Sequence, residues 1–488
     1  MALDQGTTSC RTILFGQKGE VVAVAQREFP QHYPQPGWVE HRLDEIWTAQ
    51  SWTIRAALKK AGRQPSDVRA IGITNQRETT GLWSRKTGEP VGPAIVWQCR
   101  RTAPQCEAIR QRGDEPWLRD KTGLVADAYF SATKLAWLLD NIPGARKRAE
   151  AGELAFGTMD TWLMWKLTGG ATHATDPSNA SRTLMYDLRL GGWSPELVTY
   201  FNVPTSVLPQ IQPTSGVMGE TSQKVFGAKV PIASAIGDQQ SALFGQGCFT
   251  PGTLKNTYGT GCFLLMNTGE TPIASKGGLI TSAAWRMGGK TLHILEGSIF
   301  IGGAVVQWLR DGLQVIKSAK ETEALAKSVA DTGGVYLVPA FVGLGAPYWK
   351  PEARGAVVGI TRGTTRAHLA RAALESIAFQ SAEMVHLMSD ELGKTPPALR
   401  VDGGATANNF LCQFQADLAG VPVERPKLLE TTAAGAGYLA GIATGFWSGL
   451  EEVAAIRKVD RVFEPKQSAD WRQAKMAEWK KAVQRVLL

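Results

Sequence analysis

The chain has 488 residues, of which 43% are hydrophobic and 20% are charged, as in globular proteins with sizeable apolar cores. This length predicts roughly two to four domains rather than one. The formal net charge is +9, but Lys and Arg are scattered and no nucleic-acid-binding motif of the usual spacing occurs, so we expect no nucleic-acid partner. The six cysteines form no CxxC pair, which favours a reducing, cytoplasmic setting over a disulfide framework or a zinc site.

The beginning of the chain predicts a meander of three strands. Two strands are expected within residues 2–15, around the turn Gly6-Thr7-Thr8-Ser9, and a third over residues 21–29. Glycine and hydroxyl residues in a tight turn present N–H and O–H donors to an anion such as phosphate. Asp4 precedes the turn and has the carboxylate that Mg²⁺ takes, usually with bound waters. The alternative is an ordinary hairpin turn.

Helices are predicted over residues 43–61 and 131–141, the second with Ser131 as its N-cap and leucines along one face. Residues 204–231 are rich in Pro, Thr, Ser and Gly and predict connecting structure. An apolar strand is expected over residues 232–236, followed at once by a helix. Strands and helices alternate over most of the length, which favours an α/β fold.

Several polar residues follow predicted apolar strands. Asp238 opens the helix after one of them, a position that suits catalysis because α/β sheets bind ligands beyond the carboxyl ends of their strands. A plain N-cap aspartate is the alternative. Arg77 and Glu78, in TNQRETT, can grip hydroxyl groups, one donating and one accepting; otherwise they form a solvated ion pair in a loop. Trp97 and Tyr129 either wall a substrate or fill the core.

The second half begins by repeating the opening pattern. We place a domain boundary in the break at 247–253, which gives domains 1–247 and 248–488. Just beyond it, LKNTYGTGCFLLMN echoes ALDQGTTSCRTILF, either by chance or because two homologous halves each offer a phosphate-binding turn to a central cleft. Residues 401–409, VDGGATANN, predict a strand, a glycine turn and a helix from near Asn408; the alternative is a generic turn with an Asn cap.

Two stretches near the C-terminus bear on membranes. Residues 431–450 carry no charge but are rich in Ala, Gly and Thr, which predicts a buried helix of small residues rather than a membrane span. Residues 468–488 predict an amphipathic basic helix docked on the second domain, with Trp471, Trp479, Val483 and Val486 on one face. We therefore expect no membrane insertion.

Taken together and in this order, the motifs resemble the FGGY carbohydrate kinase family, and within it the members that phosphorylate glycerol. The matching stretches run from Leu3 to Asn409 and are LDQGTTS, GWVEH, TNQRETT, VWQCRRT, GDQQSALFGQ, KNTYGTGCF, VGLGAPYW and VDGGATANN. The resemblance implies two actin-like, ribonuclease H-like α/β domains flanking a central cleft for ATP and substrate. It also implies ATP-dependent phosphorylation of glycerol to sn-glycerol 3-phosphate with Mg²⁺, as part of glycerol catabolism.

The resemblance assigns roles residue by residue. It makes Asp238 the general base, while Asp4 stays the metal residue expected from its place before the first turn. It gives the glycerol contacts as Arg77, Glu78, Trp97, Tyr129, Asp238, Gln239 and Phe263. It gives the nucleotide contacts as Thr7, Thr8, Ser9, Arg11, Thr260, Gly303, Gln307, Gly404 and Asn408. By analogy with the family, the partners are glycerol, ATP and ADP, and the chain is a homo-oligomer, either a dimer or a tetramer.

Three other interpretations stay open from the sequence. A kinase for another small polyol or sugar shares the same family pattern. An actin-like ATPase that acts as a chaperone or filament shares the nucleotide cleft but hydrolyses ATP without an acceptor. A structural binding protein accounts for none of the carboxylate placement.

Overall fold

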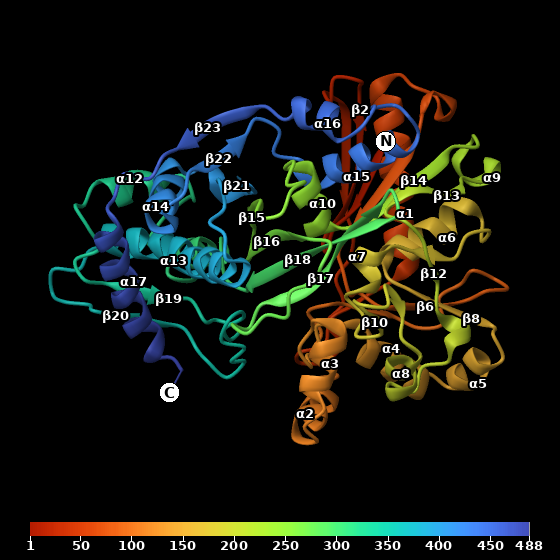
Figure 1. Ribbon diagram of the computed structural model, residues 1–488, viewed down its shortest axis with the longest axis horizontal. Coiled ribbons are helices and arrows are strands. Elements are labelled where there is room, and N and C mark those ends of the chain that lie inside the picture. Colours follow the sequence, from red (N-terminus) through yellow and green to blue (C-terminus); the bar gives the residue numbers. More distant parts are fainter. Residues whose placement is uncertain (488) are drawn as a thin grey trace.

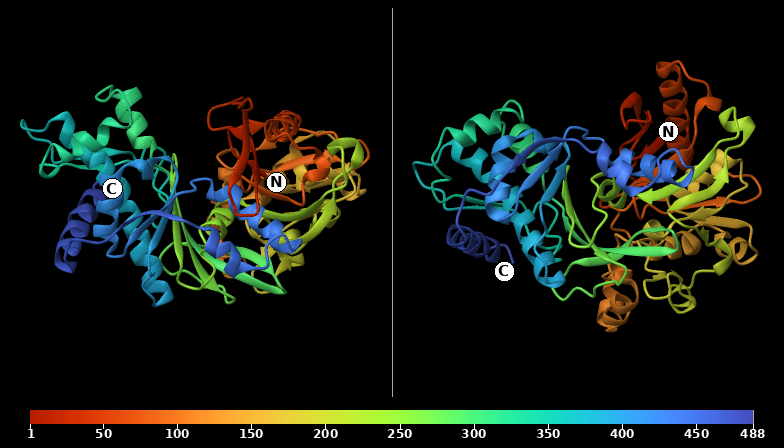
Figure 2. Two further views of the ribbon diagram at one scale, coloured as in Figure 1. Left: turned by 90° about the horizontal axis from the view of Figure 1, so that it is seen from above. Right: turned by 45° about the horizontal axis from the view of Figure 1, so that its top comes forward.

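The computed structural model describes residues 1–487 and has two lobes, each built around its own β-sheet (Figure 1). The first lobe holds a six-stranded sheet of β13 (Ser215–Glu220), β14 (Pro231–Gly237), β5 (Ile71–Asn75), β1 (Ala2–Gln5), β2 (Ser9–Phe15) and β3 (Val21–Glu28), in that order. The second holds a seven-stranded sheet of β17 (Ile280–Met287), β18 (Lys290–Ile299), β16 (Cys262–Gly269), β15 (Leu254–Tyr258), β21 (Leu399–Asp402), β22 (Val423–Pro426) and β23 (Val459–Phe463). The strands β17 and β18, green in Figures 1 and 2, reach from the second lobe toward the first.

Both sheets share one succession of strand directions. In the first, β3, β2 and β1 are antiparallel, β5 and β14 continue parallel to β1, and β13 closes the edge antiparallel. In the second, β18, β16 and β15 are antiparallel, β21 and β22 continue parallel to β15, and β23 closes the edge antiparallel. The predicted strand–turn–strand echo is therefore present, and its two turns occupy equivalent places in two sheets of matching topology.

Close packing of small residues joins the C-terminal part of the chain to the first sheet. β5 is buried along its whole length, with Ile71 and Ile73 packed in the core beside α1 (Leu43–Ala61) and α6 (Met159–Thr168). Gly72 faces the other way, against α15 (Thr431–Ala443), where a Cβ would lie 2.1 Å from the carbonyl oxygen of Ala436. The buried small-residue helix predicted within 431–450 is confirmed as α15. Among residues 1–487, no helix is long and apolar enough to cross a membrane.

Helices cover the second sheet as well. The principal ones are α12 (Glu321–Lys327), α13 (Arg366–Leu392), α14 (Asn409–Ala419) and α17 (Ala469–Gln484), with the shorter α11 (Ala304–Gln307). The strands β19 (Tyr336–Val338) and β20 (Ala356–Val358) form a separate two-stranded sheet. The short helix α16 (Leu450–Ile456) lies instead beside the first lobe, where a Cβ at Gly19 would be 2.1 Å from Ile456. α17 begins after its N-cap Ser468 and buries Trp479, whose ring stacks on Phe379 with centroids 5.2 Å apart. The predicted C-terminal helix docks on the second lobe as expected, although its final residue, Leu488, lies outside the described residues.

The rest of the first lobe is inserted between β3 and α1 and between β5 and β13, and most of it forms the lower part of that lobe in Figure 1. It contains β4 (Glu40–His41), β6 (Gly81–Ser84), β7 (Ala94–Ile95), α2 (Ala103–Gln111), α3 (Glu115–Thr122), α4 (Ser131–Asn141), α5 (Ala145–Glu150), β8 (Leu154–Gly157), β9 (Ala174–Thr175), α7 (Pro177–Ala180), β10 (Tyr186–Asp187), β11 (Gly192–Trp193), α8 (Pro195–Tyr200) and β12 (Gln210–Ile211). The predicted helices 43–61 and 131–141 are confirmed as α1 and α4.

Two local predictions are wrong. Ser131 is not the N-cap of α4: the cap position is Phe130, and the Ser131 hydroxyl instead donates to the carbonyl oxygen of Glu78 at 3.1 Å. Residues 204–231 are more than a connection, because they contain β12, β13 and the short helix α9 (Gln223–Phe226). Edge strand β13 carries Ser, Gly and Glu, since only part of it is buried, and that composition resembles a loop.

Candidate active site

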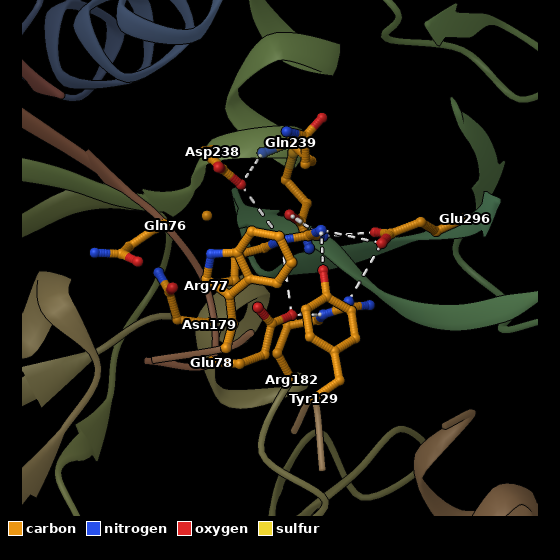
Figure 3. Close-up of polar contacts among 12 residues, drawn as sticks. Gln76, Arg77, Glu78, Tyr129, Asn179, Arg182, Asp238, Gln239 and Glu296 are labelled. Atoms are coloured by element: carbon orange, nitrogen blue, oxygen red, sulfur yellow. Dashed lines mark hydrogen bonds and ion pairs between the residues drawn. The ribbon is translucent and has the colours of Figure 1, made fainter. Parts of the chain in front are cut away.

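Two motifs that are far apart in the sequence meet between the lobes. β5 and β14 are neighbouring parallel strands, with Asn75 opposite Gly237. Arg77 follows the end of β5, and Asp238 is the first residue of α10 (Asp238–Gly245), directly after β14. Because the carboxyl ends of parallel strands share one edge, both side chains enter the same recess. Arg77 Nε lies 3.4 Å from Asp238 Oδ1 (Figure 3).

Arg77 is 3% exposed and is held at the outer end of its guanidinium. Nη1 and Nη2 donate to the two carboxylate oxygens of Glu296 at 2.5 and 3.0 Å. Nη1 also donates to Gln240 Oε1 at 3.2 Å, and Nη2 to the Tyr129 hydroxyl at 3.4 Å. These contacts leave the inner Nε–H facing Asp238.

Glu78 is also buried, so the alternative of a solvated ion pair in a loop is excluded. Its backbone has φ 60°, a left-handed conformation that is uncommon outside glycine and recurs at functional sites. Hydroxyl donors from Ser131 and Thr80 hold its carbonyl oxygen at 3.1 and 2.9 Å. Its carboxylate accepts from Arg182 Nε at 2.5 Å. Burial raises the pKa of Glu78, against the opposing effect of Arg182 and Arg77.

Asp238 is the most accessible charged group of this recess, with 28% of its side chain exposed. The backbone N–H of Gln239 donates to its Oδ1 at 2.7 Å, which fixes the carboxylate at the start of α10. Burial raises its pKa, and the cations of Arg77 and Lys255 limit that rise. A carboxylate with a raised pKa is a stronger proton acceptor, so the arrangement suits removal of a proton from a bound hydroxyl group.

Lys255, which belongs to the second lobe, hydrogen-bonds to Gln239, the neighbour of Asp238. It is fully buried on β15, and its ammonium donates to Gln239 Oε1 at 2.5 Å, to Thr257 Oγ1 at 2.9 Å and to the Phe263 carbonyl at 3.2 Å. Burial lowers its pKa to about 8. The predicted residues Gln239 and Phe263 are therefore brought together through one lysine.

Aromatic residues border the recess on the side of the first turn. The rings of Trp97 and Tyr129 meet edge to face, with centroids 5.6 Å apart. Trp97 Nε1 donates to Thr7 Oγ1 at 3.0 Å, so Trp97 contacts both Tyr129 and the turn between β1 and β2. Both aromatic residues thus lie beside the polar groups, as their expected role as substrate walls requires.

The two glycine–hydroxyl turns each close with a backbone hydrogen bond from the first glycine, and the second turn is one residue shorter. In the first, Gly6 N donates to the Ser9 carbonyl at 2.9 Å; in the second, Gly259 N donates to the Gly261 carbonyl at 2.9 Å. Thr8 and Thr260 are exposed at the tips of the two turns. The second turn packs against the start of α11, where Gly303 N donates to the Gly259 carbonyl at 2.8 Å, and Gln307 lies exposed at the end of that helix.

A third glycine turn lies beside the second. Gly403 has φ 91°, and a Cβ there would lie 2.4 Å from the Tyr258 carbonyl oxygen, so the turn after β21 presses against the end of β15. Gly404 is exposed, and nothing lies within 4 Å of where its Cβ would stand. Asn408 is the N-cap of α14, accepting from Leu411 N at 3.0 Å, so the capping role is present whatever else this residue does.

Asp4 stands at the end of β1 among other charges. Burial raises its pKa to about 6, Arg11 opposes the rise, and the negative charges of Asp238 and Glu430 add to it. Arg11 forms an ion pair with Glu430, in the loop before α15. Among residues 1–487, no group of three or more His, Cys, Asp or Glu side chains is placed to hold a metal ion.

Sequence reasoning missed Arg182, Lys255 and Glu296, three of the charged groups that organise the recess. Each lies in a largely apolar or uncharged stretch, such as HILEGSI around Glu296. A lone charge inside a predicted buried strand requires a partner, and that signal was available. Which partner it finds depends on long-range packing that no local pattern contains.

Comparison with known proteins agrees with this geometry. The N-terminal domain model of the FGGY family of carbohydrate kinases matches residues 1–245, and the C-terminal domain model matches residues 254–444. Glycerol kinase 2 of Thermotoga maritima is 57% identical over 100% of this chain and 98% of its own length. The glycerol kinase of Dechloromonas aromatica is 58% identical over 100% of this chain and 97% of its own length.

Solved structures show the same architecture. Plasmodium falciparum glycerol kinase with ADP superposes with a TM-score of 0.94 at 36% identity, covering 100% of this chain and 98% of that one. Gluconate kinase from Lactobacillus acidophilus has a TM-score of 0.89 at 21% identity, covering 100% and 97%, a likeness of fold alone. The expected two-lobed α/β fold is confirmed. The chain belongs to the FGGY family of carbohydrate kinases.

Proposed function

We propose that this kinase transfers the γ-phosphoryl group of ATP to a terminal hydroxyl of glycerol, giving sn-glycerol 3-phosphate and ADP. Full-length identities of 57–58% to proteins named glycerol kinase support the choice of substrate. The likeness to a glycerol kinase solved with ADP supports the choice of nucleotide.

One observation carries the proposal: Arg77 Nε lies 3.4 Å from Asp238 and 3.8 Å from Glu78, and no hydrogen bond joins it to either. A substrate hydroxyl group placed beside these atoms accepts from Arg77 Nε and donates to one of the two carboxylates. Glycerol has three hydroxyl groups and a small apolar carbon face. A site that combines hydrogen-bonding side chains with the aromatic side chains of Trp97 and Phe263 therefore suits it.

The reaction follows from these positions. As the hydroxyl oxygen bonds to the γ-phosphorus, the bond from phosphorus to the bridging oxygen breaks, and its electron pair leaves with ADP. The hydroxyl proton passes to the carboxylate of Asp238, while Arg77 and Glu78 hold the other hydroxyls in place. Asp238 is thus the proposed general base, and Tyr129 and Gln239 complete the proposed glycerol site.

On the nucleotide side, the three glycine turns supply hydroxyl and backbone N–H donors for the phosphates. The proposed nucleotide residues are Thr7, Thr8, Ser9, Arg11, Thr260, Gly303, Gln307, Gly404 and Asn408. Mg²⁺ bound with ATP neutralises charge on the phosphates. Asp4 fits it, because a cation would stabilise the charged form of this half-buried carboxylate, whose pKa is raised to about 6.

Three further proposals accompany this function. The domains are 1–247, with the acceptor site and first turn, and 248–488, with the main nucleotide contacts. A reducing, cytoplasmic setting is supported by six cysteines that are all buried and unpaired. A homo-oligomer stays a prediction by analogy with the family.

The test is a coupled assay of ADP release, run with glycerol, D-xylulose or D-gluconate and without any acceptor. We expect ADP release that depends on glycerol and exceeds the rate with the two sugar compounds. A rate that is the same without acceptor indicates an ATPase, and a preference for either alternative acceptor indicates another kinase of the family. Either result contradicts the proposal.

A further inference from the structure

Four buried charged side chains at the acceptor recess are joined by a continuous series of ion pairs (Figure 3). Glu78 accepts from Arg182 Nε at 2.5 Å, and Arg182 Nη2 donates to Glu296 Oε1 at 3.2 Å. Glu296 in turn accepts both outer nitrogens of Arg77, at 2.5 and 3.0 Å. All four side chains are at most 3% exposed, so their ion pairs are shielded from solvent and salt.

Glu296 belongs to a different lobe from the two arginines that it pairs with. It lies on β18 of the second sheet, where its neighbours in the ladder, Leu265 and Ile280, are apolar. Both of its cationic partners, Arg77 and Arg182, come from the first lobe. Burial alone would raise its pKa, but the two guanidiniums outweigh burial and lower the pKa to about 2. Glu296 is therefore the anion by which the second lobe holds the cations of the acceptor site.

The first consequence is orientation. The two-pronged contact with Glu296 fixes the plane of the Arg77 guanidinium. That plane directs Nε–H toward Asp238 and Glu78, at 3.4 and 3.8 Å. If one of these two hydrogen bonds is lost, the guanidinium of Arg77 can rotate, and its Nε–H no longer points in a fixed direction toward the substrate.

The second consequence is charge. Two guanidiniums and two carboxylates cancel, and beyond them Asp238 is matched by the cation of Lys255. These six groups together carry no excess charge, so the recess that they line suits a neutral hydroxyl compound. A carboxylate in place of one hydroxymethyl group meets arginines whose charge Glu296 and Glu78 already neutralise, and the nearby carboxylates of Glu78 and Asp238 repel it.

We propose that Glu296 is a positioning and specificity residue of the acceptor site: it holds Arg77 in the orientation that grips a hydroxyl, and by cancelling arginine charge it makes the site select a neutral polyol over a polyhydroxy acid. This inference rests on the proposed function. It adds a residue from the second lobe and a reason why acidic acceptors are rejected.

The test is Glu296→Gln, measured with glycerol and with D-glycerate, which carries a carboxylate in place of one hydroxymethyl group. We expect the KM for glycerol to rise about 10- to 100-fold, as for loss of a charged hydrogen bond, while the KM for ATP changes by less than about threefold. We also expect kcat/KM for glycerate, relative to glycerol, to rise at least about tenfold, because the uncompensated arginine then attracts the carboxylate. An unchanged glycerol KM or an unchanged selectivity overturns the proposal.

Two further variants separate orientation from charge and from folding. Glu296→Asp keeps the charge but shortens the side chain, so the glycerol KM rises while glycerate stays rejected. If Glu296→Gln does not fold, this variant decides, and a wild-type glycerol KM in it overturns the proposal. Glu375→Gln removes another buried glutamate that pairs with an arginine, Arg371 at 2.7 Å on α13, and leaves the selectivity unchanged. If the wild type shows no glycerol-dependent activity, it is the proposed function that fails.

Discussion

Replacing Asp238 by Asn removes one negative charge from the recess with almost no change of shape. The amide oxygen of Asn still accepts from Gln239 N, which lies 2.7 Å from Oδ1 in the wild type. Arg77 keeps its place because Glu296 holds its outer nitrogens and neutralises it. The variant therefore loses the ability to take a proton and little else.

The expected loss is that of a positioned general base. Such a base contributes typically ~10²–10⁴-fold, or about 3 to 5 kcal/mol of the activation barrier. We expect kcat to fall by that factor, the KM for glycerol to change only a few-fold, and ATP binding to stay nearly intact.

The assay is steady-state ADP release over a range of glycerol concentrations, with nucleotide affinity measured by calorimetry. Asp417→Asn serves as a matched control, because Asp417 is a buried aspartate on α14 that accepts from Gln413 and Lys466 N, away from the acceptor recess. The control is expected to stay within threefold of the wild type. Activity of Asp238→Asn within the same threefold range would refute the assignment of the base.

Three other perturbations give separate readouts. Arg77→Ala is expected to raise the glycerol KM strongly, by about 10-fold or more, with a smaller effect on the ATP KM, and to lower the melting temperature because buried Glu296 loses one of its two cationic partners. Equal rises in the two KM values, measured by initial rates, would instead indicate a folding or hinge role. Gly404→Val places a side chain in open space, so we expect a raised ATP KM with unchanged thermal stability, and a wild-type ATP KM would remove Gly404 from the nucleotide site. The third perturbation is pH. Burial lowers the pKa of His41 to about 3, so the unfolded chain, with a pKa near 6.5, takes up a proton that the folded protein excludes. The contribution of His41 to the free energy of unfolding is therefore complete above pH 6.5 and falls by about 1.4 kcal/mol for each pH unit below that value. Denaturant titrations at pH 7, 6 and 5 should show a shallower decline for His41→Gln than for the wild type, and identical slopes would contradict the linkage.

The spacing of apolar residues in the sequence predicted those helices and strands whose formation depends mainly on neighbouring residues. α1 and α4 were predicted to the residue, because an apolar stripe with helical spacing specifies its own burial. The echo between the openings of the two halves predicted two equivalent turns, and the matching strand directions of the two sheets agree with it. The Ser131 cap failed because the backbone is already helical at that residue: Phe130 has the extended conformation of the cap position, and the Ser131 hydroxyl donates to the Glu78 carbonyl.

The acceptor recess was predictable only in part. Asp238 and Arg77 follow adjacent parallel strands, and their meeting follows from topology once that adjacency is known. The partners of Arg77 and Glu78 did not follow from sequence, because Glu296 lies 219 residues from Arg77 and Arg182 lies 104 residues from Glu78. The first pairing is set by how the two lobes pack, and the second by how distant segments of the first lobe pack together.

Phosphoryl transfer to glycerol is tested most directly by ³¹P NMR of the reaction of the wild-type protein with ATP, Mg²⁺ and glycerol. We predict that the γ-phosphate resonance of ATP is replaced by that of sn-glycerol 3-phosphate, with one molecule formed for each ADP, and that ATP is consumed only when glycerol is present. Release of inorganic phosphate in place of sn-glycerol 3-phosphate, or consumption of ATP at the same rate without glycerol, would contradict it.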